Sequence, residues 1–241
     1  MPRILTASDR SALIRLASTM PSGSPERKAI LAGLTRNASG EANIPGIHVF
    51  GNARVTGEAQ VYGEAKVGGS AEVSGRVEVF GKALVFNNAR VYDEAKVSGD
   101  ANVSGDANVF GDAQVSGKAK VYDVARVSGR AQVSGDAKVY DEAKVTGEAK
   151  VSGKAHVYGK AQVFGDARVY GDAKVYGGSR VSGSAQVLGK AWVGGDAAVS
   201  GDAEVYGRAR IGGAAVILGG SWDGSEGPVL SGRWLAPGVP A

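Results

Sequence analysis

A β-branched aliphatic residue occupies every sixth position of the chain from Val49 to Ile217. The recurring unit is Ala-x-Val-x-Gly-x, as in the hexapeptides that begin at Ala113 and Ala167. Within each unit, Ala and Val alternate with variable residues, which is the period-two pattern of a β-strand with one buried face. A short period kept over this length is typical of a solenoid, in which each repeat packs on its neighbours.

Ala and Val are predicted to face the interior of this solenoid, and the variable residues beside Val are predicted to face outward. The inward position before Val departs from Ala at Val77, Ser179 and Ser221. The glycine of each unit is predicted to form a left-handed corner. It is replaced by Asn87, Asp93, Asp123 and Asp141. Asn and Asp are the residues that, after Gly, best tolerate a positive φ.

Outward residues repeat every eighteen positions, most visibly at Tyr122, Tyr140, Tyr158 and Tyr176. Three hexapeptides therefore complete one coil, and three flat sides give a triangular prism. Each short strand must pair in parallel with the next coil, about 4.8 Å away. About twenty-eight hexapeptides then predict roughly nine coils, each one strand spacing apart.

The unit Ala-x-Val-x-Gly-x at this spacing resembles the hexapeptide-repeat family over residues 47–221. The resemblance implies an all-β solenoid, the left-handed parallel β-helix; the period alone does not give the hand, since parallel crossovers are generally right-handed. It also implies an acyltransferase-like superfamily, many of whose members form trimers through their flat sides and bind acetyl-CoA between subunits.

Composition narrows the class of protein. The 241 residues include 38 Gly and no Cys, so the chain offers neither a disulfide nor a thiol nucleophile. The formal net charge of +4 permits an anionic partner but is far from the dense basic surface of a dedicated nucleic-acid binder. The chain shows neither a signal peptide nor a membrane-spanning stretch. We expect a cytoplasmic or virion-associated protein.

Residues 1–36 lie outside the repeat and are predicted to form a short α-helical hairpin, followed by a linker over residues 37–46. The apolar positions of the hairpin are Leu13, Ile14, Met20, Ile30, Leu31 and Leu34. The hairpin could cap the open end of the solenoid or dock another protein, and both alternatives stay open. The segment from Leu13 to Leu34 also resembles helical segments of phage-encoded structural proteins.

Residues 222–241 are predicted to form a C-terminal cap or tail. Their apolar residues Val229, Leu230, Trp234 and Leu235 are expected to cover the last coil.

The outward residues differ between the three sides. One side combines basic and aromatic residues, and we take it as the candidate interface or ligand face: Lys120, Tyr122, Lys138, Tyr140, His156, Tyr158, Lys174, Tyr176 and Trp192. An exposed aromatic strip bordered by Lys is typical of a contact surface for another subunit, a polysaccharide or an anionic ligand. Of these we expect another subunit, which would give a homo-oligomer such as the trimers of the hexapeptide-repeat family; a polysaccharide or an anionic ligand is the alternative. Tyr is also favoured on any pleated surface, so β-propensity alone is a second explanation.

Acidic residues often follow the corner and basic residues often stand two positions later, as in Glu148 with Lys150 and Asp172 with Lys174. We expect these to form solvated ion pairs, each contributing less than about 1 kcal/mol.

The chain has two histidines, His156 in the basic and aromatic side and His48 in the first repeat. A general base needs a pocket and an orienting partner, and a repeat without insertions supplies neither. We therefore expect a non-enzymatic structural or binding rod from a phage or bacterium, with no cofactor and no metal. The alternative is a hexapeptide-type acyltransferase that uses acetyl-CoA and His156 or His48.

Overall fold

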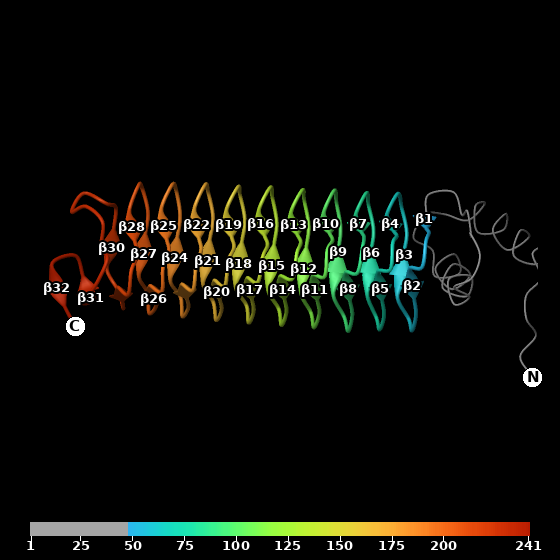
Figure 1. Cartoon of the computed structure of the whole chain (residues 1–241), viewed down its shortest axis with the longest axis horizontal. Coiled ribbons are helices and arrows are strands. Elements are labelled where there is room, and N and C mark those ends of the chain that lie inside the picture. The colour runs from blue at the N-terminus through green and yellow to red at the C-terminus, as the bar shows by residue number, and fades with distance from the viewer. Residues whose placement is uncertain (1–47) are drawn as a thin grey trace, which may run out of the picture.

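Residues 48–241 form a straight rod of stacked coils. The computed structural model describes residues 48–241, all of whose regular elements are short β-strands. Figure 1 shows the coils following one another from β1 at one end to β30 near the other. The predicted N-terminal hairpin and the linker lie outside the described residues.

The strands form three sheets that run the length of the rod, which we number I, II and III. Sheet I contains β1 (His48–Val49), β4 (Lys66–Val67), β7 (Leu84–Val85), β10 (Asn102–Val103), β13 (Lys120–Val121), β16 (Lys138–Val139), β19 (His156–Val157), β22 (Lys174–Val175), β25 (Trp192–Val193) and β28 (Arg210–Ile211). Sheet II contains β2 (Arg54–Val55), β5 (Glu72–Val73), β8 (Arg90–Val91), β11 (Asn108–Val109), β14 (Arg126–Val127), β17 (Lys144–Val145), β20 (Gln162–Val163), β23 (Arg180–Val181), β26 (Ala198–Val199), β29 (Val216–Ile217), β31 (Arg233–Ala236) and β32 (Val239–Pro240). Sheet III contains β3 (Gln60–Val61), β6 (Glu78–Val79), β9 (Lys96–Val97), β12 (Gln114–Val115), β15 (Gln132–Val133), β18 (Lys150–Val151), β21 (Arg168–Val169), β24 (Gln186–Val187), β27 (Glu204–Val205) and β30 (Ser221–Trp222).

Successive coils are in an eighteen-residue register. Val121 pairs with Val139, which in turn pairs with Val157, and every strand from β1 to β30 pairs in parallel. The predictions of three strands per coil and of a parallel solenoid are therefore confirmed. Sheets I and III each hold ten strands, so the rod has about ten coils where the hexapeptide count predicted about nine. The left hand implied by the resemblance stays a prediction.

The core is a column of stacked Val flanked by Ala, as the alternation predicted. From Ala65 to Val205 the inward Ala and Val side chains are fully buried. Val77 occupies an Ala position and is also fully buried. Ser179 occupies another, and its hydroxyl donates to the Tyr176 carbonyl at 2.7 Å, so the buried polar group is satisfied.

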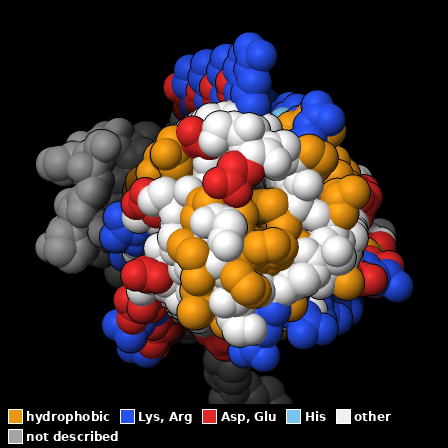
Figure 2. Space-filling view, turned by 90° about the vertical axis from the view of Figure 1, so that its left-hand side faces the viewer, with side chains coloured by type: hydrophobic (Ala, Val, Ile, Leu, Met, Phe, Trp, Pro, Cys, Tyr) orange, Lys and Arg blue, Asp and Glu red, His pale blue; other side chains and the backbone are white. Residues whose placement is uncertain are grey.

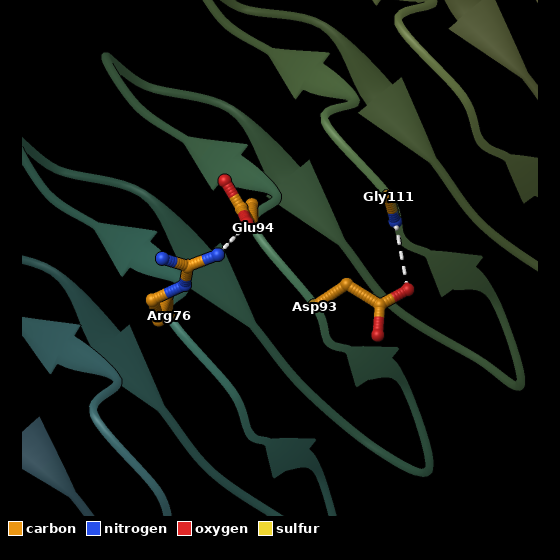
Figure 3. Close-up of polar contacts among 4 residues, drawn as sticks. All are labelled: Arg76, Asp93, Glu94 and Gly111. Atoms are coloured by element: carbon orange, nitrogen blue, oxygen red, sulfur yellow. Dashed lines mark hydrogen bonds and ion pairs between the residues drawn. The ribbon is translucent and has the colours of Figure 1, made fainter.

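The corners are left-handed. Asn87, Asp93, Asp123 and Asp141 have φ between 57° and 64°, which confirms the interpretation of these substitutions. The side chains of three of them also bond to the next coil. Asp93 accepts a hydrogen bond from the Gly111 amide at 3.1 Å, as Figure 3 shows, and Asp141 accepts one from Gly159 at 3.0 Å. Asp123 accepts a longer one from Asp141.

Ion pairs join successive coils, and the expectation that they join residues two apart is wrong for the described part of the chain. The pairs are Arg76–Glu94 (Figure 3), Arg90–Glu72, Lys96–Glu78 and Arg130–Glu148. Partners lie eighteen residues apart because side chains at equivalent positions of adjacent coils point the same way. Glu148, for example, lies in the turn before β18 and pairs with Arg130 of the preceding coil instead of with Lys150 of β18.

The pattern slips by one residue near the C-terminal end. Glu204 pairs with Ser221 and Val205 pairs with Trp222, so the buried Trp222 takes the Val position and Ser221 is exposed. The prediction of an inward Ser221 is therefore wrong. The last coil is one residue shorter at Gly219-Gly220, and a slip of one residue exchanges the two faces of a strand.

Residues beyond β30 cover part of the C-terminal end. Val229 and Trp234 pack against the core, and β31 pairs with β29. Leu230 and Leu235, also expected to cover the last coil, remain 58% and 51% exposed because their side chains alternate with those of the packed residues. Figure 2 looks onto this end, where apolar side chains gather at the centre and charged side chains surround them.

Candidate functional site

The basic and aromatic residues singled out in the sequence all lie on the outer face of sheet I. One row precedes the buried Val of each strand and contains Lys66, Leu84, Asn102, Lys120, Lys138, His156, Lys174, Trp192 and Arg210. The second row follows Val and contains Phe50, Gly68, Phe86, Ser104, Tyr122, Tyr140, Tyr158, Tyr176, Gly194 and Gly212. We call this surface the sheet I face. Its strand positions carry several cations and, among the described residues, no carboxylate.

Four tyrosines on this face form a continuous stack, the Tyr ladder: Tyr122, Tyr140, Tyr158 and Tyr176. The ring centroids of Tyr122 and Tyr140 are 5.0 Å apart with an interplanar angle of 2°, and those of Tyr140 and Tyr158 are 5.0 Å apart at 1°. Tyr158 and Tyr176 are 5.4 Å apart at 13°. Parallel rings at this separation must overlap, because rings lying side by side in one plane would collide.

The stack decides which part of each ring meets solvent. The faces of the inner rings, Tyr140 and Tyr158, are covered by neighbouring rings, and all four side chains are half-buried. What remains accessible is the ring edge with its hydroxyl. The ladder therefore offers a row of phenol groups for hydrogen bonding and no flat aromatic platform.

Ionisation of three of these hydroxyls is disfavoured. Burial raises the pKa of Tyr140 to about 12, with further contributions from the adjacent Tyr122 and Tyr158 and from Asp141 and Asp123. Burial also raises the pKa of Tyr122 and of Tyr158. The hydroxyls of Tyr122, Tyr140 and Tyr158 thus remain neutral donors over the whole physiological range of pH.

We expect Tyr122, Tyr140 and Tyr158 to ionise later than free tyrosine. In the unfolded chain the phenol pKa is about 10, whereas Tyr140 in the rod titrates at about 12. The folded rod disfavours the phenolate, so the neutral phenol contributes to the free energy of unfolding. This contribution is complete below about pH 10 and is lost as the pH rises through about 12. Absorbance of the phenolate during alkaline titration measures the effect.

The control is Tyr140→Phe, which should remove part of the late absorbance change. The remainder should come from Tyr62, whose pKa burial and Glu78 raise to about 12, and from Tyr92, Tyr122 and Tyr158, whose pKa burial also raises. Superimposable titration curves for the native and the urea-unfolded chain would contradict the expectation.

The cationic row runs beside the Tyr ladder and ends at Trp192. The Lys174 ammonium lies 5.0 Å from the centroid of the Trp192 ring, and the Arg210 guanidinium also lies 5.0 Å from it. These cation–π contacts hold the indole between two cations on neighbouring coils. Although Trp192 is exposed, part of its ring is therefore already engaged within the chain.

His156 interrupts the lysines of this row. Burial lowers its pKa, and Lys138 and Lys174 on the adjacent strands lower it further, so the imidazole is neutral at neutral pH. Its ring packs edge-on against the Tyr140 ring, with the two ring centroids 6.1 Å apart. Within the described chain no carboxylate pairs with it, and a general base is normally oriented by such a group. His48 lies in β1 of the same sheet.

Glycines at both ends of the aromatic row make room for rings, which the sequence reasoning missed. A Cβ on Gly194 would lie 2.2 Å from Cζ of Tyr176, so the last ring of the ladder lies over Gly194. A Cβ on Gly68 would lie 2.3 Å from the Phe50 ring. The Phe50 ring extends across the coil of Gly68, and its centroid lies 5.3 Å from that of the Phe86 ring. The signal in the sequence was a glycine in the eighteen-residue series of aromatic residues.

A second candidate is an open polar hollow of about 610 Å³ on sheet II, lined by Ser70, Glu72, Asn88, Arg90, Asp106, Asn108, Val124 and Arg126. Its polar groups largely bond to each other. Arg90 pairs with Glu72 at 3.6 Å. The carboxylate of Asp106 accepts a hydrogen bond from the Asn88 side chain at 2.9 Å, and the backbone carbonyl of Asp106 accepts one from the Asn108 side chain at 2.9 Å. The sheet I face has fewer internal partners for its cations and is the stronger candidate.

Residues 48–241 contain neither a cluster of metal-ligating side chains nor a membrane-spanning helix. No three His, Asp or Glu side chains of that region gather as metal ligands would. The same residues include no helix long and apolar enough to cross a bilayer.

Comparison with known proteins supports the fold class. The family described as YdcK beta solenoid repeat matches residues 161–183, which span β20 (Gln162–Val163) to β23 (Arg180–Val181). The chain is similar to this repeat over about one and a quarter coils. No curated protein matches the chain.

Proposed function

We propose that this protein is a non-enzymatic, rigid rod that binds an anionic polysaccharide along the sheet I face. The observation that carries the proposal is the row of cations beside the Tyr ladder, on strands without a carboxylate. Sheets II and III differ, since Glu72 on sheet II and Glu78 and Glu204 on sheet III lie among their basic residues.

The spacing of the cations favours an extended polymer. Lys120 and Lys138 stand on adjacent coils, about 4.8 Å apart along the rod axis, and Lys174 follows two coils further on. A flexible polyanion can place successive charges along such a row, and it gains by releasing its bound counterions. The neutral phenols of the Tyr ladder can donate hydrogen bonds to the same chain.

The stacking of the rings selects between polyanions. Proteins that bind single-stranded nucleic acids stack bases on exposed aromatic faces. In the Tyr ladder the inner faces are covered, and Trp192 lies between two cations. A polymer recognised by charge and by hydroxyl groups, such as an acidic polysaccharide, therefore suits the surface better than a nucleic acid.

Binding of heparin, a sulfated polysaccharide, tests the proposal by isothermal titration calorimetry. Replacing Lys120, Lys138 and Lys174 together by Glu should weaken binding at least about thirtyfold and flatten its dependence on salt, because three polymer contacts are lost. Uncharged dextran should not bind.

The matched control replaces Arg126, Lys144 and Arg180 by Glu, which changes the net charge equally on sheet II. It should retain most of the affinity. Equal weakening by both triple variants would show that net charge and not the sheet I face binds the polymer, and would refute the proposal.

A further inference from the structure

The corner between sheets III and I carries a regular series of charges. The residue after each corner glycine or its equivalent alternates in sign through eight successive coils: Glu64, Lys82, Asp100, Lys118, Asp136, Lys154, Asp172 and Lys190. We call this series the charged edge. All eight residues are exposed, and Arg208 in the next coil ends the alternation.

The charged edge is held in strict register by the backbone. The amide of Lys118 donates to the Gly135 carbonyl at 2.7 Å, and the amide of Asp136 donates to the Gly153 carbonyl at 2.7 Å. The same bond recurs from Glu64 to Lys190 at 2.7–2.8 Å. Charges of opposite sign therefore follow one another at about 4.8 Å along a straight line.

The other strongly charged edge differs in both pattern and pairing. Between sheets II and III the corner residues run Glu58, Arg76, Glu94, Asp112, Arg130, Glu148 and Asp166. Two ion pairs, Arg76–Glu94 and Arg130–Glu148, join coils there. Among the described residues, those of the charged edge form no ion pair within 4.0 Å, so their charges are available to a partner.

We propose that the charged edge joins two copies of this chain side by side and antiparallel. An even number of alternating charges is complementary to itself when reversed. Glu64 then faces Lys190, Lys82 faces Asp172, Asp100 faces Lys154, and Lys118 faces Asp136; the two-fold axis doubles each contact. A parallel arrangement in register would place every charge opposite its like.

The flank of the charged edge permits close approach. On the sheet III side the nearest outward residues in the middle of the rod are Ser98, Ser116, Ser134 and Ser152. Their short side chains leave the longer Lys, Asp and Glu side chains as the most prominent groups. A single surface ion pair contributes less than about 1 kcal/mol, so the association depends on the whole series and should be sensitive to salt.

The dimer would also enlarge the polysaccharide surface. The two-fold axis stands perpendicular to the plane of the two rods, so both sheet I faces lie on the same side, next to the shared edge. This consequence rests on the proposed function. The association of the two copies does not rest on it and can be measured without any polymer.

Sedimentation velocity on the full chain tests the association. At about 20 mM salt we expect a dimer that dissociates to a monomer at about 500 mM, where the screening length falls to a few ångströms. A chain that is monomeric at low salt, or a dimer that salt does not weaken, would overturn the proposal.

Charge-reversal variants distinguish a charged edge that binds a second copy from one that only stabilises its own rod. One variant replaces Glu64, Asp100, Asp136 and Asp172 by Lys, and the other replaces Lys82, Lys118, Lys154 and Lys190 by Glu. Each alone should be monomeric at low salt, and their equimolar mixture should restore the dimer. Persistence of either dimer alone, or no association in the mixture, contradicts the inference.

A third variant carries all eight reversals at once and therefore keeps the alternation of charge. Its charged edge has no run of like charges, so it serves as a test even if repulsion between like charges prevents the first two variants from folding. It should associate with itself, yet not with the wild-type chain, because the antiparallel register would then oppose like charges. Mixed dimers of this variant with fluorescently labelled wild type would refute the antiparallel arrangement.

Orientation can be read independently because the chain has no Cys. Glu64→Cys and Lys190→Cys chains should form a disulfide with each other when mixed, and neither should form one with its own kind. Disulfides within either single-variant sample would indicate a parallel pair and overturn the proposal.

Discussion

Replacing Val139 by Asp is expected to unfold the middle of the rod at neutral pH. Val139 is fully buried between Val121 and Val157 of the adjacent coils. A carboxylate there has no ionic partner, and an unpaired buried charge costs at least about 4 kcal/mol. Circular dichroism during thermal unfolding measures the loss.

Because a solenoid is stabilised by contacts between neighbouring coils, one broken coil should also divide the cooperative unit. We therefore expect a broader transition, with the two halves melting separately. Burial raises the pKa of a carboxyl group, so lowering the pH should protonate the introduced Asp and restore part of the stability.

Val139→Thr is the matched control, since Thr has nearly the same shape and its hydroxyl can donate to a carbonyl, as that of Ser179 does. Its cost should be about 1–2 kcal/mol. An Asp variant that melts like the Thr variant at neutral pH would disprove the dry, stacked core.

Replacing Gly129 by Val is expected to have the second-largest effect. Gly129 has a φ of 67°, and a Cβ there would lie 3.0 Å from the carbonyl oxygen of Gly147 in the next coil. A β-branched residue is strained in this conformation and also meets backbone that is itself stacked. We expect a loss of about 2–4 kcal/mol, which corresponds to a melting temperature about 10 °C lower.

Gly129→Asp is the control that the chain itself suggests. Asp93 occupies the equivalent corner, and its carboxylate accepts a hydrogen bond from the Gly111 amide. Asp at 129 can accept one from the Gly147 amide, so its cost should stay near 1 kcal/mol. Equal losses for Val and Asp would show that the corner tolerates no Cβ of any kind.

The sequence predicted the fold from two periods. The six-residue period of Val identified the buried positions and the corners, and Asn87 or Asp123 in place of Gly revealed their left-handed backbone. The eighteen-residue echo of Tyr122 and Tyr140 gave the number of sides. These predictions succeeded because each coil repeats the same contacts, so local pattern and global structure carry the same information.

Where the repeat changed, the pattern could not be extended. The one-residue slip at Gly219-Gly220 placed Trp222 inside and Ser221 outside, because a coil that is one residue shorter exchanges the two faces of the strand that follows. Ion pairs such as Arg130–Glu148 join coils and not neighbours in sequence. Both outcomes depend on which atoms face each other in space, and spacing along the chain does not contain this information.

At the candidate site, too, the spacing along the chain predicted some features and contacts in space decided the others. By itself, the sequence determined that Lys120, Tyr122 and their equivalents share one side of the rod, because an eighteen-residue repeat admits no other placement. The tertiary structure alone decided that the Tyr rings stack at 5.0 Å and present their edges. It also decided that Trp192 lies between two cations. The physical reason is that the backbone period fixes where each Cβ lies, whereas the contacts between neighbouring side chains fix how each ring is turned.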